Sequence, residues 1–466
     1  MPAKEFSLEP QRVGPVNTPY RRIQTALPVP DSLPMFEQLR THEARSMRGQ
    51  PPVVWAEAED ILIRDGYGNQ WLDWSSGVLV GNAGHNHPHI KQALSQYLDS
   101  SAPIMTYCFA HEARAALAAR LVELSPDPLG RVFLLTTGSE ATEVAIKLAR
   151  THGIRKHSAK RIMVTYACGF HGRTYGAQLA GGVLGGAEWV DENPTFVQVP
   201  FPSSIDEQDD SFASFTGALR AAGVDPNQVA GVMAETFQGR EAKLMPTDYA
   251  QQLRAWCDEH DAALIFDEVQ AGFGRTGKMF AFEHYGIVPD MVCCGKGISS
   301  SLPLSAVIGT SEYVDQYAPG EMTSTHTGSP LPCVAALANL DVIADEGLVE
   351  NAAIQGRYLQ EQLIEITAPY HAHIEVGGTG LVIAMLFFNN RDELAPDADA
   401  AFEFCEKCFH RGNLFFAPVG KGYGAMKFCP PLTITREAID DGLYGAGGVR
   451  QTLEEVLSAR LNGAPA

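Results

Sequence analysis

The sequence lacks long apolar runs, an excess of basic residues and a dense set of cysteines. No uncharged apolar stretch of about 18 residues occurs, so no membrane-spanning helix is predicted. The 466 residues contain 35 Lys and Arg against 55 Asp and Glu, a net charge of -20. Because binding to a phosphate backbone needs a concentrated basic face, we expect no nucleic-acid partner. The nine cysteines are sparse and odd in number, which excludes a disulfide scaffold.

The N-terminal residues MPAKEFSLEP show no basic stretch followed by an apolar one, so no secretory signal is predicted. We therefore expect a cytoplasmic protein with reduced thiols. Hydrophobic residues make up 45% and charged residues 19% of the chain, which is globular composition and excludes disorder as the main state. The acidity does not exclude a small anionic ligand, which needs only a local positive pocket.

From about Arg131 the chain alternates short apolar runs with helical patterns. Residues 137–140 have the spacing of a capping box and predict the start of a helix. Strand–helix–strand alternation predicts an α/β fold with a mostly parallel sheet, whose ligands bind beyond the carboxyl ends of the strands. The predicted strands are residues 131–135, 161–166, 229–235, 263–269 and 291–294, with a helix at 247–260.

After about Leu331 the pattern changes to that of a smaller α+β domain, completed by N-terminal residues. We predict an N-terminal arm with part of the small domain at 1–75, a large ligand-binding domain at 76–330 and a C-terminal small domain at 331–466. The predicted elements of the last part are helices at 331–346, 397–411 and 436–459 and a strand pair within 373–387.

Three short motifs invite binding interpretations that the sequence does not favour. Residues 272–277 fit a dinucleotide-binding pattern and most of a Walker A loop, but Met279 stands where that loop needs Ser or Thr. Pro88 interrupts the alternating histidines of residues 85–89, and residues 405–408 hold a single CxxC where zinc sites normally need two pairs. We interpret these segments as a turn, a structural or cofactor-adjacent loop, and core or surface thiols.

Lys296 and Asp267 are candidate catalytic residues. Lys296 follows the apolar run 291–294 between glycines, and a desolvated lysine there can become a nucleophilic amine. Taken alone, this signal is weak, because most lysines are solvated surface charges. Asp267 ends the apolar run 263–266, where a carboxylate needs a buried cationic partner. A pyridinium nitrogen is such a partner, and a helix cap or a structural ion pair is the alternative.

Two further segments follow predicted strands. Gly138 and Ser139, at the head of a helix, offer backbone N–H groups and a helix dipole to a phosphate. Phe170, in Phe170-His171-Gly172, offers a ring that could stack on a planar cofactor. Each signal could be packing, but their common position after strands favours one cofactor site. The longer motifs around them are TTGSEATE (136–143), FHGRT (170–174), LIFDEVQAGFGRTG (264–277), Gly295-Lys296 and PPLTIT (430–435), preceded by Asp65-Gly66, Trp71-Leu72-Asp73 and Gly84-His85-x-His87-Pro88.

With these motifs the chain resembles, from about Asp65 to Leu453, the class III pyridoxal phosphate-dependent aminotransferases, the fold type I group of 4-aminobutyrate and ornithine aminotransferases. The resemblance implies pyridoxal 5'-phosphate as cofactor and a large domain with a seven-stranded sheet. It further implies that Lys296 forms the internal aldimine and moves the proton, and that Asp267 keeps the pyridine nitrogen protonated. Gln270 would bond the phenolic oxygen of the cofactor.

The resemblance also assigns the remaining cofactor contacts. Phe170 and Val269 would enclose the ring, and Gly138 and Ser139 would bind the phosphate. His171 belongs to the same predicted cofactor site. Thr325, in STHTGSP, would reach the phosphate of a neighbouring subunit. The resemblance therefore implies a homodimer with shared active sites, alone or as part of a tetramer.

Four positions bear on the substrate. Arg173 resembles the arginine that holds the distal carboxylate of ω-amino acids, and a structural ion pair is its alternative. Glu235 agrees with the family pattern. Arg240 stands where relatives carry a glutamate that screens a second arginine, and Lys427 stands where that second arginine grips the α-carboxylate. The glutamate–arginine pair of the relatives is therefore replaced at both positions, by Arg240 and by Lys427.

The first functional hypothesis is an aminotransferase that moves an amino group from a 4-aminobutyrate-like ω-amino acid, or an amine, to a 2-oxo acid. The alternative is an amino-acid racemase, epimerase or decarboxylase on the same scaffold, which the altered substrate positions leave open. A non-enzymatic binding protein is disfavoured because Lys296, Asp267 and Gln270 are all present.

Overall fold

The computed structural model divides into two compact units, Pro88–Glu350 and Met1–His87 with Asn351–Ala466. The sequence predicts limits at 75 and 330, and the assignment of functions to those predicted domains stays a prediction. No helix among the described residues is long and apolar enough to cross a bilayer. The structure describes residues 4–182, 189–191, 193–202, 209–240, 242–420, 422 and 424–461.

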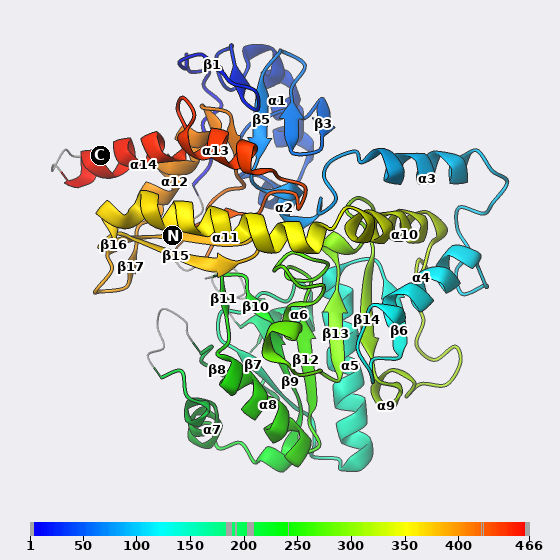
Figure 1. Ribbon diagram of the computed structural model, residues 1–466. Coiled ribbons are helices and arrows are strands. Elements are labelled where there is room, and N and C mark those ends of the chain that lie inside the picture. Colours follow the sequence, from blue (N-terminus) through cyan, green and yellow to red (C-terminus); the bar gives the residue numbers. More distant parts are fainter. Residues whose placement is uncertain are drawn as a thin grey trace. The chain divides into compact units, whose positions relative to one another are not determined.

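The unit Pro88–Glu350 is built on a seven-stranded sheet (Figure 1). In spatial order its strands are β6 (Arg131–Leu135), β14 (Ser305–Gly309), β13 (Met291–Cys294), β12 (Ala263–Asp267), β9 (Val229–Glu235), β7 (Ile162–Tyr166) and β8 (Phe196–Val199). β14 pairs antiparallel with both of its neighbours, and the other neighbouring strands are parallel. The predicted α/β class with a mostly parallel sheet is therefore confirmed.

The central strands are apolar because both faces of the sheet are covered. Every residue of β9 and of β12 is buried, so these strands read in the sequence as continuous apolar runs. β6, β9 and β13 have the predicted limits, whereas β12 ends at Asp267 and not at residue 269. β8 and β14 are not among the predicted strands. The half-buried residues of β8 give it only a weak apolar pattern.

α-Helices lie in the connections from β6 to β12. α5 starts at the predicted capping box, in which Thr137 and Glu140 bond each other's backbone N–H groups. Its small residues Ala141, Ala145 and Ala149 pack into the main core. The helices of this unit are α3 (Pro88–Leu98), α4 (Glu112–Glu123), α5 (Gly138–Lys156), α6 (Tyr175–Gly181), α7 (Phe212–Ala221), α8 (Thr247–Glu259), α9 (Ser311–Val314) and α10 (Pro330–Asp345), with α11 (Leu348–Thr367) beginning at its end.

The other unit contains two smaller sheets, which agrees with the predicted α+β part of the fold. One has the order β1 (Val16–Asn17), β2 (Arg22–Ile23), β5 (Gln70–Asp73), β4 (Leu62–Arg64), β3 (Glu57–Glu59), with β18 (Asn413–Leu414) parallel to β5. The second has the order β15 (Ile374–Thr379), β16 (Val382–Asn390), β17 (Ala395–Pro396), with β19 (Ala425–Phe428) also on β16.

The predicted last helix at 436–459 is wrong in one respect, because the structure has two helices there. α13 (Arg436–Tyr444) and α14 (Val449–Leu461) are separated by a glycine-rich turn. Gly447 has a φ of 67°, which a right-handed helix cannot include. The other helices of this unit are α1 (Leu33–His42), α2 (Ser76–Leu79) and α12 (Ala398–Phe409).

Residues near the two ends of the chain are joined inside this unit. Arg21 is fully buried. Its Nε and Nη2 donate to the Oδ2 and backbone O of Asp441 at 2.9 and 2.7 Å, and its Nη1 donates to the backbone O of Arg411 at 3.1 Å. A buried guanidinium with these three acceptors strongly stabilises the contact between segments that are distant in the sequence.

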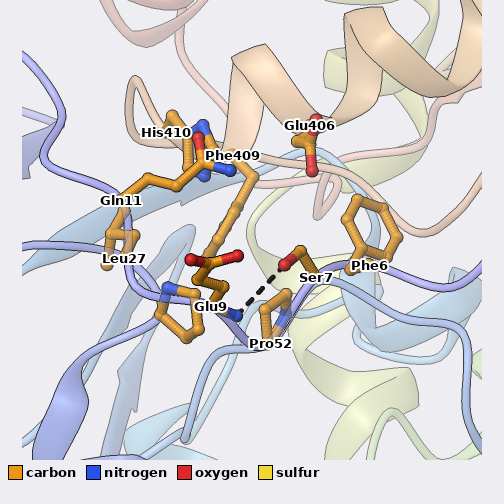
Figure 2. Close-up of a pocket in the computed structure, with 10 residues that line it drawn as sticks. Phe6, Ser7, Glu9, Gln11, Leu27, Pro52, Glu406, Phe409 and His410 are labelled. Carbon is orange, nitrogen blue, oxygen red and sulfur yellow. Dashed lines mark hydrogen bonds between the residues drawn. The ribbon is translucent and has the colours of Figure 1, made fainter.

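A small pocket of this unit contains none of the predicted site residues (Figure 2). Phe6, Leu27 and Phe409 supply apolar walls, and Glu406 and His410 lie at its edge. Burial, with the charges of nearby basic residues, lowers the pKa of His410 to about 4. The CxxC cysteines before it are free and buried, so they are core and not surface thiols.

Candidate active site

Three predicted site residues follow adjacent strands. Asp267 and Glu235 are the last residues of β12 and β9 and pair directly in the sheet register. Lys296 lies two residues beyond the end of β13, which neighbours β12 on the other side. Since these strands are parallel, all three residues lie at one edge of the sheet, where α/β proteins bind ligands.

The carboxylate of Asp267 is buried and already oriented. Its Oδ2 lies 2.8 Å from His171 Nδ1, and its Oδ1 accepts a hydrogen bond from Val269 N at 2.9 Å. Burial disfavours the charged imidazole, but the hydrogen bond and charge of Asp267 outweigh it and raise the pKa of His171. The other ring nitrogen, His171 Nε2, is buried with no hydrogen-bond partner among the described residues.

Lys296 begins a short turn with unusual backbone geometry. Its φ is 42° and that of Ser300 is 53°, values that side-chain-bearing residues rarely adopt. Such conformations cost of order 1–3 kcal/mol and persist where the surroundings enforce them, often at functional sites. Asn339, fully buried on α10, donates from Nδ2 to Gly297 O at 2.9 Å and to Ile298 O at 3.1 Å. Asn339 is not among the sequence-predicted site residues, because nothing in the sequence links α10 to this turn.

Gly138, Val269 and Gly295 form a narrow contact beside this lysine. A Cβ on Gly138 would lie 2.9 Å from Val269 Cγ1, and one on Gly295 would lie 3.2 Å from the same atom. These glycines therefore allow the start of α5, Val269 and the lysine turn to approach each other. A flat ring could be bounded here by Val269 without larger side chains in the way.

The start of α5 is suited to an anion. The Thr137 side chain caps the N–H of Glu140, and no described residue accepts from the N–H groups of Gly138 and Ser139. The loop of Gly172 lies against this helix start, because a Cβ on Gly172 would be 2.3 Å from Ser139 Oγ. Free N–H groups and the positive end of a 19-residue helix favour a phosphate.

The segment FHGRT places an aromatic ring and a cation together. Phe170 is 46% exposed, and the Arg173 Cζ lies 5.6 Å from the centre of its ring. Glu143 of α5 fixes the next residues, since its Oε1 accepts from Thr174 Oγ1 at 2.6 Å and Gly176 N at 2.7 Å. Glu143 thus caps α6 from another helix. It lies in the TTGSEATE motif, but only the fold brings it to this loop.

Glu235 is buried and connects several of these segments. Its Oε2 accepts from Phe170 N at 3.1 Å, and its Oε1 accepts from Gly239 N at 3.1 Å and Gln270 Nε2 at 3.4 Å. Burial raises the pKa of Glu235; the charge of His171 opposes this rise and that of Asp267 adds to it.

Two of the predicted site residues do not follow the strands described above. Lys427 lies on β19 in the other compact unit and is buried. Thr325 is exposed in the segment after β14, near Thr323, whose Oγ1 lies 3.2 Å from Tyr107 OH. The structure therefore gathers the predicted cofactor residues of unit Pro88–Glu350 at one sheet edge, with Thr325 on its surface.

A mostly parallel α/β sheet with a lysine turn after one strand and a buried aspartate after the next defines the class of fold type I pyridoxal phosphate-dependent transferases. The family model for class III aminotransferases matches residues 44–445. This chain belongs to the class III aminotransferase family and is an aminotransferase.

Named relatives agree with this assignment. The chain is 33% identical over 398 residues to the 4-aminobutyrate aminotransferase of Escherichia coli K12, covering 84% of this chain and 92% of that protein. It is 31% identical over 422 residues to the acetylornithine aminotransferase of Caldanaerobacter subterraneus, covering 87% and 95%. An ornithine aminotransferase structure from Toxoplasma gondii superposes with a TM-score of 0.79 at 26% identity, covering 92% of this chain and 95% of that one.

Class III aminotransferases use pyridoxal 5'-phosphate, and the Toxoplasma structure is described with this cofactor at its active site. The residues of this chain fit the group. The carboxylate of Asp267 suits a pyridinium nitrogen, the start of α5 suits a phosphate, and the glycines around Val269 leave the approach to the ring clear.

Proposed function

We propose that this aminotransferase moves an amino group from an ω-amino acid, such as 4-aminobutyrate, or from an amine to a 2-oxo acid. The observation that carries this is Arg173, an exposed guanidinium beside Phe170 whose loop is held by Glu143. A planar guanidinium can bind a carboxylate through two hydrogen bonds. The similarity to a 4-aminobutyrate aminotransferase supports the same donor class.

Pyridoxal 5'-phosphate, when bound, supplies the carbonyl that accepts the amino group and a ring that withdraws electrons from the reacting carbon. Lys296 would hold the cofactor and move the proton at the carbon that carries the amino group. Asp267, oriented by His171 and Val269 N, would keep a proton on the pyridine nitrogen. The unpaired Nε2 of His171 offers one more polar atom to this site.

The other cofactor residues would position the group. Gln270 would bond its phenolic oxygen, Phe170 and Val269 would bound its ring, and the N–H groups of Gly138 and Ser139 would bind its phosphate. Thr325, exposed on its loop, would contact the phosphate held by a second copy of the chain. The assembly would then be a homodimer with shared sites, alone or within a tetramer.

The substrate residues would act by charge. Arg173 would hold the distal carboxylate of the donor, and Lys427 would contribute a second positive charge for an acid group. Glu235 would keep Phe170, Gly239 and Gln270 in place through its three hydrogen bonds. All nine cysteines are free, which supports a reducing compartment such as the cytoplasm.

The test is one half-reaction followed by visible absorption. The cofactor-loaded protein is mixed with 4-aminobutyrate in the absence of any 2-oxo acid, and the aldehyde product is measured. Loss of the visible cofactor band with one aldehyde formed per site supports the proposal, and later addition of a 2-oxo acid should restore the band. A persistent band with all ω-amino acids and amines tested would reject this donor class. Continued turnover without a 2-oxo acid would favour isomerase or decarboxylase chemistry.

A further inference from the structure

Arg240 is a charged residue next to Gly239 at the edge of the site. Among the described residues its buried Nη1 has no hydrogen-bond partner, and its guanidinium forms no ion pair. A buried guanidinium nitrogen without an acceptor costs free energy, so such groups are usually paired. An arginine left in this state is ready for an anionic ligand.

Arg240 lies between two short paired strands. It lies in the turn between β10 (Phe237–Gln238) and β11 (Lys243–Leu244), which pair antiparallel. Ala242 N donates to Gln238 O at 2.9 Å and closes the turn. The guanidinium is therefore carried by a short hairpin and not by a long loop.

This turn lies beside the reacting end of the proposed cofactor site. Gly239 touches Gln270, since a Cβ on Gly239 would lie 2.6 Å from Gln270 Nε2. Gln270 is the residue proposed to bond the phenolic oxygen next to the reacting carbonyl. Arg240 follows Gly239 directly, so its backbone begins about 3.8 Å further along the chain.

Glu235, the buried carboxylate bonded to Gly239 N, forms no ion pair with Arg240. Both oxygens of Glu235 already accept hydrogen bonds from Phe170, Gly239 and Gln270. Arg173 belongs to a different segment, beside Phe170. The site therefore has two separate guanidinium groups, one on each segment.

We infer that Arg240 binds the α-carboxylate of the 2-oxo acid acceptor, the carboxylate directly attached to the reacting carbonyl. This inference rests on the proposed function. It makes 2-oxo acids, and not simple aldehydes or ketones, the acceptor class. With Arg173 available for a second carboxylate, 2-oxo diacids such as 2-oxoglutarate carry one carboxylate for each cation.

The experiment compares acceptors with and without this carboxylate. The wild-type holoenzyme and Arg240→Gln are assayed with pyruvate, 2-oxoglutarate and propanal, which has the carbon number of pyruvate but no carboxylate. Loss of a charge-assisted bidentate contact should lower kcat/KM for both 2-oxo acids by about 10- to 100-fold, with little change for propanal. Arg220→Gln, an exposed arginine at the end of α7, is the matched control for the loss of one charge.

A second readout does not depend on turnover. Binding of glutarate, a diacid that cannot react, is measured by calorimetry on the holoenzyme. Its Kd should rise by about tenfold or more in Arg240→Gln and less in Arg240→Lys, which keeps the charge but loses the planar fork. Arg240→Lys also provides the test if the glutamine variant does not fold.

Equal losses for pyruvate and propanal, or an unchanged preference for pyruvate, would overturn the role of Arg240. This failure is distinct from that of the proposed function. If the wild-type enzyme transfers no amino group from any ω-amino acid or amine, the donor assignment fails first. If it does so and Arg240→Gln still discriminates normally, only the inference about the acceptor fails.

Discussion

His171 Nδ1 lies 2.8 Å from Asp267 Oδ2, and both side chains are buried. A carboxylate can only accept in such a bond, so Nδ1 carries the proton. Asp267 is thereby held in one orientation, while the opposite ring nitrogen of His171 stays without a described partner. The aspartate that should face the cofactor nitrogen is thus positioned by a titratable group.

This pair should make stability depend on pH. The pKa of His171 is raised above 6.5, so its contribution to folding is complete below pH 6.5 and is lost as pH rises through the raised value. Thermal unfolding midpoints of the wild type and His171→Asn should therefore converge as pH increases above 6.5. Buried Glu268, with its pKa raised to about 7, produces a decline of the same sign in both proteins and so cancels from their difference. A constant difference across pH would contradict the role of the pair.

Lys296→Ala should abolish multiple turnover. Proton transfer by a positioned side chain contributes roughly 10²–10⁴-fold, and the covalent hold on the cofactor is lost as well. The visible spectrum of the protein after addition of cofactor should lose the band of the lysine-bound form. Lys278→Ala, at an exposed position, is the control and should behave as wild type. Sustained turnover by the Lys296 variant would refute the assigned mechanism.

Gly138→Ala should weaken cofactor binding. The new Cβ would lie 2.9 Å from Val269 Cγ1, which forces a shift at the narrow contact beside the lysine turn. Overpacking of this kind costs about 1–3 kcal/mol, so we expect the Kd for pyridoxal 5'-phosphate to rise roughly tenfold or more. Equilibrium dialysis measures it directly. Val269→Ala removes the opposing methyl groups, and the double variant should recover part of the loss; additive effects would count against direct contact.

Arg173→Ala should raise the KM for donors that carry a distal carboxylate. The lost charge-assisted contact predicts about a 10- to 100-fold increase for 4-aminobutyrate, with a small effect on butylamine, which has no carboxylate. Initial rates with both donors provide the comparison. If the KM values for both donors change equally, Arg173 has a structural role.

The variant Glu143→Gln tests whether Glu143 positions Arg173. Glu143 caps α6 by accepting from Thr174 Oγ1 and two backbone N–H groups. Weakening this cap should cost about 1 kcal/mol of stability and raise the KM for 4-aminobutyrate while leaving that for butylamine unchanged. Glu123→Gln, which removes an exposed ion pair with Arg120, serves as control. A lower melting temperature without any donor-specific effect would restrict Glu143 to a structural role.

The sequence predicts the central sheet without β8 and β14, and the positions of Asp267 and Lys296, because buried parallel strands appear as apolar runs with polar residues at their ends. It does not reveal Asn339 or Glu143 as supports, since their contacts join segments that are distant in the chain. It also misses the break at Gly447, because the flanking segments share a helical composition. Apolar patterns report burial, whereas these features depend on contacts between elements.

The bond between Arg21 and Asp441 has a consequence for the order of events during synthesis. Pro88–Glu350 is continuous in sequence and can fold as soon as it has left the ribosome. The other unit cannot close until the last quarter of the chain exists, because β5 pairs with β18 and the Arg21 guanidinium must find residues 411 and 441. The N-terminal segment is made first and is among the last to reach its final partners.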